Sequence, residues 1–179
     1  IEVSIPAGTW ESFQMETLLH KSMKQNGPGR HTTNVNPNFV LTEMIVKVAG
    51  ASKPVDFGRV VVDFNQGGFL PEQLFDGNLD TRNGWAIAPE FGKAHWVQAE
   101  FAEPLVLDKD SKLLIEMKHL YGGGRNVGRP RFSLSTDGVK KGDAENKRLD
   151  ELLAKEKRHG KEEKELRAIF DQGNPKPMD

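Results

Sequence analysis

The stretch that decides the fold class of this 179-residue chain is Val97-Gln98-Ala99-Glu100-Phe101. Apolar and polar side chains alternate in it, which is the period of a β-strand with one face in a core. The same alternation recurs at residues 13–19, 60–64, 113–118 and 131–135. Clusters of Gly, Pro, Asn and Asp separate these stretches, at spacings typical of an all-β domain. The sequence therefore predicts several short strands, each with one buried face.

Residues 39–48 read FVLTEMIVKV and are apolar on both faces. A strand of this kind is expected at the centre of a sheet, because both of its faces must be covered. With the alternating stretches it makes at least six expected strands in residues 1–142. That number and spacing predict an all-β fold, a two-sheet β-sandwich of the jelly-roll type.

Residues 143–179 have a different composition, since about half of them are charged. Their apolar residues recur at helical spacing and predict two short helices hinged near Gly160, with one narrow apolar stripe. The stripe consists of Leu149, Leu152, Leu153, Leu166, Ile169 and Phe170. We therefore expect a sandwich over 1–142 and a charged helical linker or extension over 143–179.

Composition excludes several classes of function. The chain has 25 Lys and Arg against 26 Asp and Glu, a balance that does not favour nucleic acid or a membrane surface. No apolar run approaches the roughly 18 residues of a membrane span. The absence of cysteine excludes disulfides, thiolate zinc sites and covalent haem attachment in this chain. The start at Ile1, without Met or a leader, predicts a piece of a longer protein, and we expect it to be a monomer.

Residues 75–81, FDGNLDT, place oxygen-bearing side chains at alternate positions around a glycine. They imitate the opening of an EF-hand loop, but Thr81 stands where that loop needs Gly, and Ile87 stands where it needs a bidentate Glu. Two interpretations remain: an Asx-type turn, or an irregular calcium loop. For the latter, the expected ligands are Asp76, Asp80 and Thr81, with oxygens of Asn78 and Phe75. Oxygen ligands favour calcium over zinc.

Other motifs do not indicate an enzyme. The glycine-rich residues 121–129 match neither the dinucleotide nor the phosphate-loop spacing. The five histidines show no metal-binding spacing, and no G-x-S-x-G elbow selects a serine nucleophile. We therefore predict no catalytic residues.

Six stretches taken together carry a resemblance to a known family. They are NGPGR at 26–30, NFVLTE at 38–43, the loop at 75–81, GWAIAP at 84–89, FGKAHW at 91–96 and GRPRFSLS at 128–135. This order resembles the sandwich module between the two conserved uncharacterised domains of planctomycete-type multidomain cytochrome c proteins. The resemblance implies a large exported protein, periplasmic or at the cell surface, whose flanking domains and haem lie outside this chain.

Those modules are similar to galactose-binding-like, or discoidin-type, β-sandwiches. A D-G-x-x-x-T loop precedes a Trp in such domains, as Asp76, Gly77 and Thr81 precede Trp85 here. A Glu on the last strand commonly completes a structural calcium site beside that loop. The similar strand of this chain comes before the loop, which suggests a circularly permuted strand order and implies Glu43 as a further calcium ligand.

Two hypotheses for the function follow from this resemblance. The first is a noncatalytic carbohydrate-binding module for a polysaccharide or oligosaccharide, with ligand contacts from loops. Its expected binding residues are Trp85, His95, Tyr121, Arg125 and Arg129. The alternative is a structural interdomain module without a ligand, which expects those same side chains to be buried or paired internally.

Overall fold

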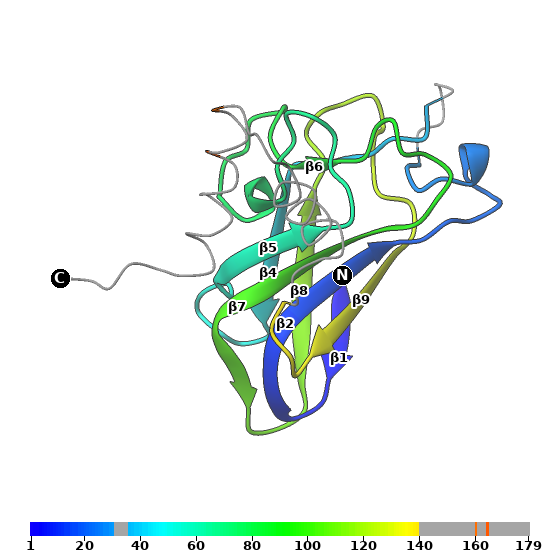
Figure 1. The fold of residues 1–179 in the computed structure, drawn as a ribbon. Coiled ribbons are helices and arrows are strands. Elements are labelled where there is room, and N and C mark those ends of the chain that lie inside the picture. Colours follow the sequence, from blue (N-terminus) through cyan, green and yellow to red (C-terminus); the bar gives the residue numbers. More distant parts are fainter. Residues whose placement is uncertain (31–35, 140–159, 161–163, 165–179) are drawn as a thin grey trace. The chain divides into compact units, whose positions relative to one another are not determined.

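A computed structural model describes residues 1–30 and 36–139, together with Gly160 and Lys164. The strands of the described residues form antiparallel sheets, and the only helices within residues 1–30 and 36–139 are two short 3-10 helices (Figure 1). The mostly β character expected from the alternating stretches is confirmed. The helical tail expected over 143–179 lies outside the described residues, apart from Gly160 and Lys164. No described helix is long and apolar enough to cross a membrane.

Residues 1–30 and 36–139 contain nine strands and two 3-10 helices. They are β1 (Glu2–Ile5), β2 (Gly8–Thr17), η1 (Lys24–Asn26), β3 (Val40–Leu41), β4 (Glu43–Val48), β5 (Phe57–Val62), η2 (Pro71–Leu74), β6 (Trp85–Ala86), β7 (His95–Leu107), β8 (Ser111–Lys118) and β9 (Pro130–Ser135).

Two larger sheets and one small sheet contain these strands. The four-stranded sheet has the order β5-β7-β2-β9, the three-stranded sheet has the order β1-β8-β4, and β3 pairs with β6. The stretch Val97–Phe101 lies in β7, between β5 and β2, with Val97, Ala99 and Phe101 buried and the residues between them half-buried. The alternation of apolar and polar residues in this stretch therefore corresponds to a strand with one face in the core, as expected.

The main hydrophobic core contains residues of both larger sheets, and a small second cluster consists of Val40, Phe69 and Ala86. The four-stranded sheet contributes Phe13, Met15, Val60, Val97, Ala99 and Phe101, and the three-stranded sheet contributes Ile5, Met44, Val46, Leu113 and Ile115. Rings pack closely within it, and those of Phe13 and Phe57 lie 6.0 Å apart. Side chains of both sheets thus cover each other's apolar faces, which is what stabilises each sheet.

The expected central strand over 39–48 is wrong in its position. The run divides at Thr42 into β3, which joins the small sheet, and β4, which is an edge strand. At the division, the Thr42 N–H donates to the Lys118 carbonyl, and the Thr42 hydroxyl oxygen accepts from the Leu120 N–H. The 3-10 helix η2 packs against β4. Apolar residues on both faces of this run therefore reflect covering by other segments rather than a central place in a sheet.

Gly84 allows the small sheet to form beside the core. Its φ is +104°, and a Cβ at this position would lie 2.0 Å from the carbonyl oxygen of Leu41. Only glycine combines that backbone conformation with such a close approach of two chains. The contact brings β6 alongside β3 and directs Trp85 into the core.

Candidate functional site

The loop at 75–81 consists of successive Asx turns. A side-chain oxygen of Asp76 accepts from the Asn78 N–H at 2.8 Å, that of Asn78 from the Asp80 N–H at 3.0 Å, and that of Asp80 from the Arg82 N–H at 2.8 Å. Such turns satisfy backbone donors locally and need no metal. The Asx-turn interpretation therefore describes the hydrogen bonding of this loop, whose residues 76–81 are all exposed.

Asn83 holds this loop together through its side-chain amide. Its amide nitrogen lies 2.9 Å from an Asp76 carboxylate oxygen, 2.9 Å from the Asn78 carbonyl and 3.1 Å from the Gln73 carbonyl. The residue is 4% exposed. A buried amide with several acceptors ties both ends of the loop to η2. The spacing of the acidic residues carries no signal for this role.

Glu43 lies beneath the loop, at the start of β4. The residue is 5% exposed, and its Oε2 atom has no hydrogen-bond partner. Burial and the nearby Asp76 carboxylate raise the pKa of Glu43 to about 7, although a hydrogen bond from the Gly77 N–H opposes that rise. The structure therefore brings together Glu43 and Asp76, which the resemblance implied as joint ligands.

The Glu43 and Asp76 carboxylates could bind a hard cation, but the loop would have to provide the remaining ligands. A buried carboxylate oxygen without a donor is costly unless it is protonated or meets a cation. Within the described residues no three acidic or histidine side chains gather in one place. The remaining ligands of a calcium ion would then be carbonyl, amide or hydroxyl oxygens, which calcium accepts. Asp80 and Thr81 are exposed at the far end of the loop.

Two of the five predicted binding residues are buried. Trp85 is 0% exposed, its indole N–H donates to the Phe64 carbonyl at 2.9 Å, and its ring meets Phe39 edge-on at 5.0 Å. His95 is 1% exposed. Neither ring has a face open to a sugar in this structure, and both satisfy their polar atoms internally.

His95 forms a charged pair with Asp63. Its Nδ1 lies 2.9 Å from a carboxylate oxygen of Asp63, and its Nε2 lies 2.6 Å from the Glu90 carbonyl. Both partners can only accept, so both ring nitrogens donate and the ring is an imidazolium. Burial alone would lower the pKa of His95, but these two hydrogen bonds outweigh it and raise the pKa above 6.5.

Asp63→Asn is expected to lower the free energy of unfolding at pH 6 by about 1.5–3 kcal/mol, the contribution of a hydrogen bond to a charged group. The Asn oxygen can still accept from the Trp96 N–H, as Asp63 does at 3.0 Å. Its amide would donate to Nδ1 and force a neutral ring. Because the pKa of His95 is higher in the folded than in the unfolded protein, its protonation stabilises the fold at a pH below the unfolded-state pKa. This stabilisation is lost as the pH rises through the folded-state pKa.

The deficit of Asp63→Asn should therefore shrink between pH 6 and pH 9, measured by urea unfolding. Asp108→Asn, in an exposed turn, is the matched control. A deficit that is the same at every pH would contradict an imidazolium at His95.

The other three predicted residues lie along one loop. Tyr121 is 40% exposed, and the guanidinium carbon of Arg125 lies 4.9 Å from the centre of its ring. Arg129 is exposed, and one of its nitrogens donates to the Leu19 carbonyl at 3.4 Å. The loop thus presents an aromatic ring and two guanidinium groups on the protein surface.

Residues 26–30, one of the six stretches that carry the resemblance, pair with this loop. The Arg30 N–H donates to the Asn126 carbonyl at 2.8 Å, and the Gly128 N–H donates to the Pro28 carbonyl at 2.9 Å. A Cβ on Gly128 would lie 1.9 Å from the sulfur of Met23, so only glycine at position 128 leaves room for the Met23 side chain. Backbone pairing of the two loops places Arg30 near Arg129.

A polar pocket of about 370 Å³ opens between these loops, and we call it the arginine pocket. Its lining consists of His20, Ser22, Met23, Arg30, Gly128 and Arg129. Its volume lies within the range of small-molecule sites, about 300–1,000 Å³. Of the predicted binding residues only Arg129 reaches it. His20 and Ser22 belong to no motif, and Arg30 ends the NGPGR stretch without being one of the predicted binding residues. Only the pairing of two distant loops brings Arg30 close to Arg129.

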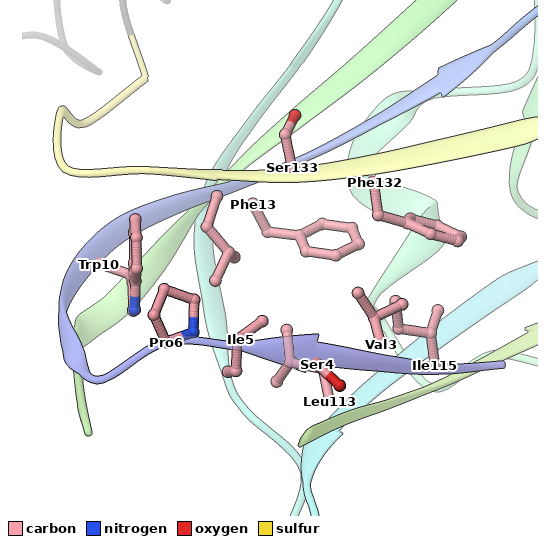
Figure 2. A pocket seen from close by; sticks show the side chains of 11 residues that line it. Val3, Ser4, Ile5, Pro6, Trp10, Phe13, Leu113, Ile115, Phe132 and Ser133 are labelled. Atoms are coloured by element: carbon pink, nitrogen blue, oxygen red, sulfur yellow. The ribbon is translucent and has the colours of Figure 1, made fainter. Parts of the chain in front are cut away.

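A second hollow, the apolar pocket, lies between the edges of the two larger sheets. Figure 2 shows β1 side chains such as Val3 and Ile5 facing Phe13 of β2 and Phe132 of β9, with Trp10 at one end. Its volume is about 190 Å³. The indole nitrogen of Trp10 is buried without a hydrogen-bond partner. Its polar side chains are those of Ser4 and Ser133, so it offers few groups for sugar hydroxyls.

Comparison with known proteins returned no match: no family model, no curated protein and no solved structure is similar to the chain. The site is therefore interpreted from its own geometry.

Proposed function

We propose that the chain is a noncatalytic carbohydrate-binding module of a larger exported multidomain cytochrome c protein. In this proposal the β domain is a two-sheet sandwich of the galactose-binding-like type with a structural calcium ion. One observation carries the proposal. Tyr121 and Arg125 lie in the same loop as Gly128 and Arg129, which line the arginine pocket. We call the surface of this loop the ligand-binding face.

The chemistry of the ligand-binding face suits a sugar. An exposed aromatic ring can pack against the apolar face of a pyranose, and guanidinium groups donate to neighbouring hydroxyls. Arg125 lies over the Tyr121 ring, and Arg129 borders the pocket on the same loop. Because such a surface buries little of a ligand, the dissociation constant for a short oligosaccharide is expected to be on the order of micromolar to millimolar.

The acid-base candidates of the described residues support binding without cleavage. In a Ser-His-Asp triad, the ring nitrogen that does not face the carboxylate must take a proton from the nucleophile. That nitrogen of His95 already donates to the Glu90 carbonyl. Glu43 has a raised pKa, but it lies buried beneath the Asp76 loop and lines neither the arginine pocket nor the apolar pocket.

Calcium would act on structure rather than on the sugar. The Asp76 and Glu43 carboxylates would hold it, with oxygens of Phe75, Asn78, Asp80 and Thr81 as further candidates. A divalent ion there would neutralise the buried Glu43 carboxylate together with the exposed Asp76 carboxylate, and would join β4 to the loop that leads into β6. The ion would thereby fix the segment that places Trp85 in the core.

A structural interdomain module without a ligand is the second candidate. The internal hydrogen bonds of Trp85 and His95 favour it, because it expects those side chains to be buried. Tyr121, Arg125 and Arg129 separate the two candidates, because a module without a ligand does not need their exposure.

Affinity gels containing plant and algal polysaccharides test the proposal with the full chain. We expect retention on at least one polysaccharide and no release of reducing ends. Tyr121→Ala and Arg125→Ala should each weaken retention about tenfold or more, the loss of a charge-assisted hydrogen bond or a stacking contact. Arg131→Ala is the control, because Glu16 already binds that guanidinium through two hydrogen bonds. Retention on no polysaccharide would favour the structural module.

A further inference from the structure

We propose that the arginine pocket selects glycans that carry an anionic substituent, the carboxylate of a uronic acid or a sulfate ester. The inference rests on the proposed function and names the class of ligand for the same face. It starts from the charges that line the pocket. Among the described residues that line it, Arg30, Arg129 and His20 are the ionisable groups, and none is Asp or Glu. The chain as a whole is nearly neutral, so this is a local excess of positive charge.

Arg131, close to the pocket in sequence, differs from Arg129 because a carboxylate neutralises its guanidinium. Arg131 lies two residues after Arg129 and is bound by both carboxylate oxygens of Glu16. Within the described residues, the guanidinium of Arg129 makes one long hydrogen bond, to the Leu19 carbonyl at 3.4 Å. A guanidinium has five N–H donors, so most donors of Arg129 remain for a ligand. The planar fork of such a group matches the geometry of a carboxylate or sulfate.

His20 adds a directed donor at the edge of the pocket. Its Nδ1 accepts from the Ser22 N–H at 3.2 Å and lies 2.7 Å from the Ser22 hydroxyl. The proton of the neutral ring is therefore on Nε2, which is left to donate. An anion in the pocket would accept from this nitrogen as well as from the guanidinium groups. A neutral hydroxyl could use one of these donors, whereas an anionic group can accept from several at once.

Met23 gives the pocket an apolar component beside the cations. Its sulfur occupies the space that a Cβ on Gly128 would fill, and the stem of Arg30 borders the same position. A sugar ring presents C–H groups as well as its substituent, and the polarizable thioether can contact them. The pocket therefore suits an anionic group attached to a ring.

Pairs of polysaccharides that differ only in charge provide the test. Polygalacturonate is compared with its methyl ester, and a sulfated galactan with its desulfated form, by affinity gel and calorimetry on the full chain. We expect the acidic member of one pair to bind at least tenfold more tightly at low salt. That preference should fall as salt is raised, because the contacts are solvent-exposed. Which pair shows it distinguishes a carboxylate from a sulfate.

Variants assign the preference to the pocket. Arg30→Ala and Arg129→Ala should each reduce it severalfold with an unchanged melting temperature, and Arg131→Ala should leave it intact. Equal affinity within both pairs, in a protein that still binds glycan, would overturn the inference and leave the proposed function standing. A preference that survives both pocket variants would also overturn it. Binding to no glycan would overturn the proposed function itself, and the inference with it.

Discussion

Trp85→Ala is expected to lower the free energy of unfolding by about 3–5 kcal/mol, the range for truncation of a large aromatic side chain in a core. The ring is 0% exposed and packs edge-on against Phe39 at 5.0 Å. The substitution also removes the donor to the Phe64 carbonyl, so a buried acceptor loses its partner. Urea unfolding followed by circular dichroism measures the loss.

Tyr121→Ala is the contrasting variant. Its ring is 40% exposed, and exposed substitutions usually change stability by about 0.5 kcal/mol or less. The expected pattern is thus a large loss of stability at Trp85 and a loss of glycan binding at Tyr121. A Trp85→Ala protein with wild-type stability but without glycan binding would contradict the buried position of the ring.

Chelation of calcium should destabilise the protein most strongly at neutral pH, because of Glu43. The folded protein raises the pKa of this carboxyl from 4.5 to about 7. At a pH below the pKa of Glu43 in both the folded and the unfolded protein, the carboxyl is protonated in both states and the raised pKa does not change the free energy of unfolding. As the pH rises from 4.5 to 7, the unfolded state ionises first, so stability falls. The full difference corresponds to about 3 kcal/mol as an upper value.

Calcium should reverse this loss, since it binds the ionised carboxylate. At 100 times its dissociation constant it would add about 2.7 kcal/mol. Urea unfolding at pH 5 and pH 7.5, with calcium or with a chelator, measures the effect. Glu43→Gln should remove the contribution of Glu43 to the pH slope and abolish the response to calcium, while Glu103→Gln, an exposed substitution, should preserve both. Unfolding that ignores both pH and calcium would leave the Asx turns as the whole explanation of the loop.

The sequence predicted the strands well where one face is buried and the other is solvated. Val97, Ala99 and Phe101 alternate with polar residues and do face the core. The predicted central position of the run at 39–48 was wrong. The pattern of apolar residues indicates that both faces of a strand are covered, but it does not indicate which segment covers them. The cover of this run comes partly from η2, some 25 residues later in the chain.

Less of the candidate site was predictable, since its parts are joined by contacts between distant segments. The proximity of Glu43 and Asp76 followed from the resemblance alone, because neither spacing nor periodicity connects them. The carbohydrate-binding hypothesis predicts His95 as a binding residue, although its position in β7 and its pairing with Asp63 bury it. Arg30 and Arg129 share a pocket only because residues 26–30 pair with residues 126–128.

The most direct test of glycan binding at the loops is an NMR titration of the full ¹⁵N-labelled chain with an oligosaccharide from the retaining polysaccharide. The account predicts shift changes at Arg30 and along residues 121–129. The indole N–H signals of Trp10, in the apolar pocket, and of Trp85, in the core, should stay unchanged. Shift changes centred on Trp10 and Phe132, or no changes at the two loops at saturating ligand, would contradict it.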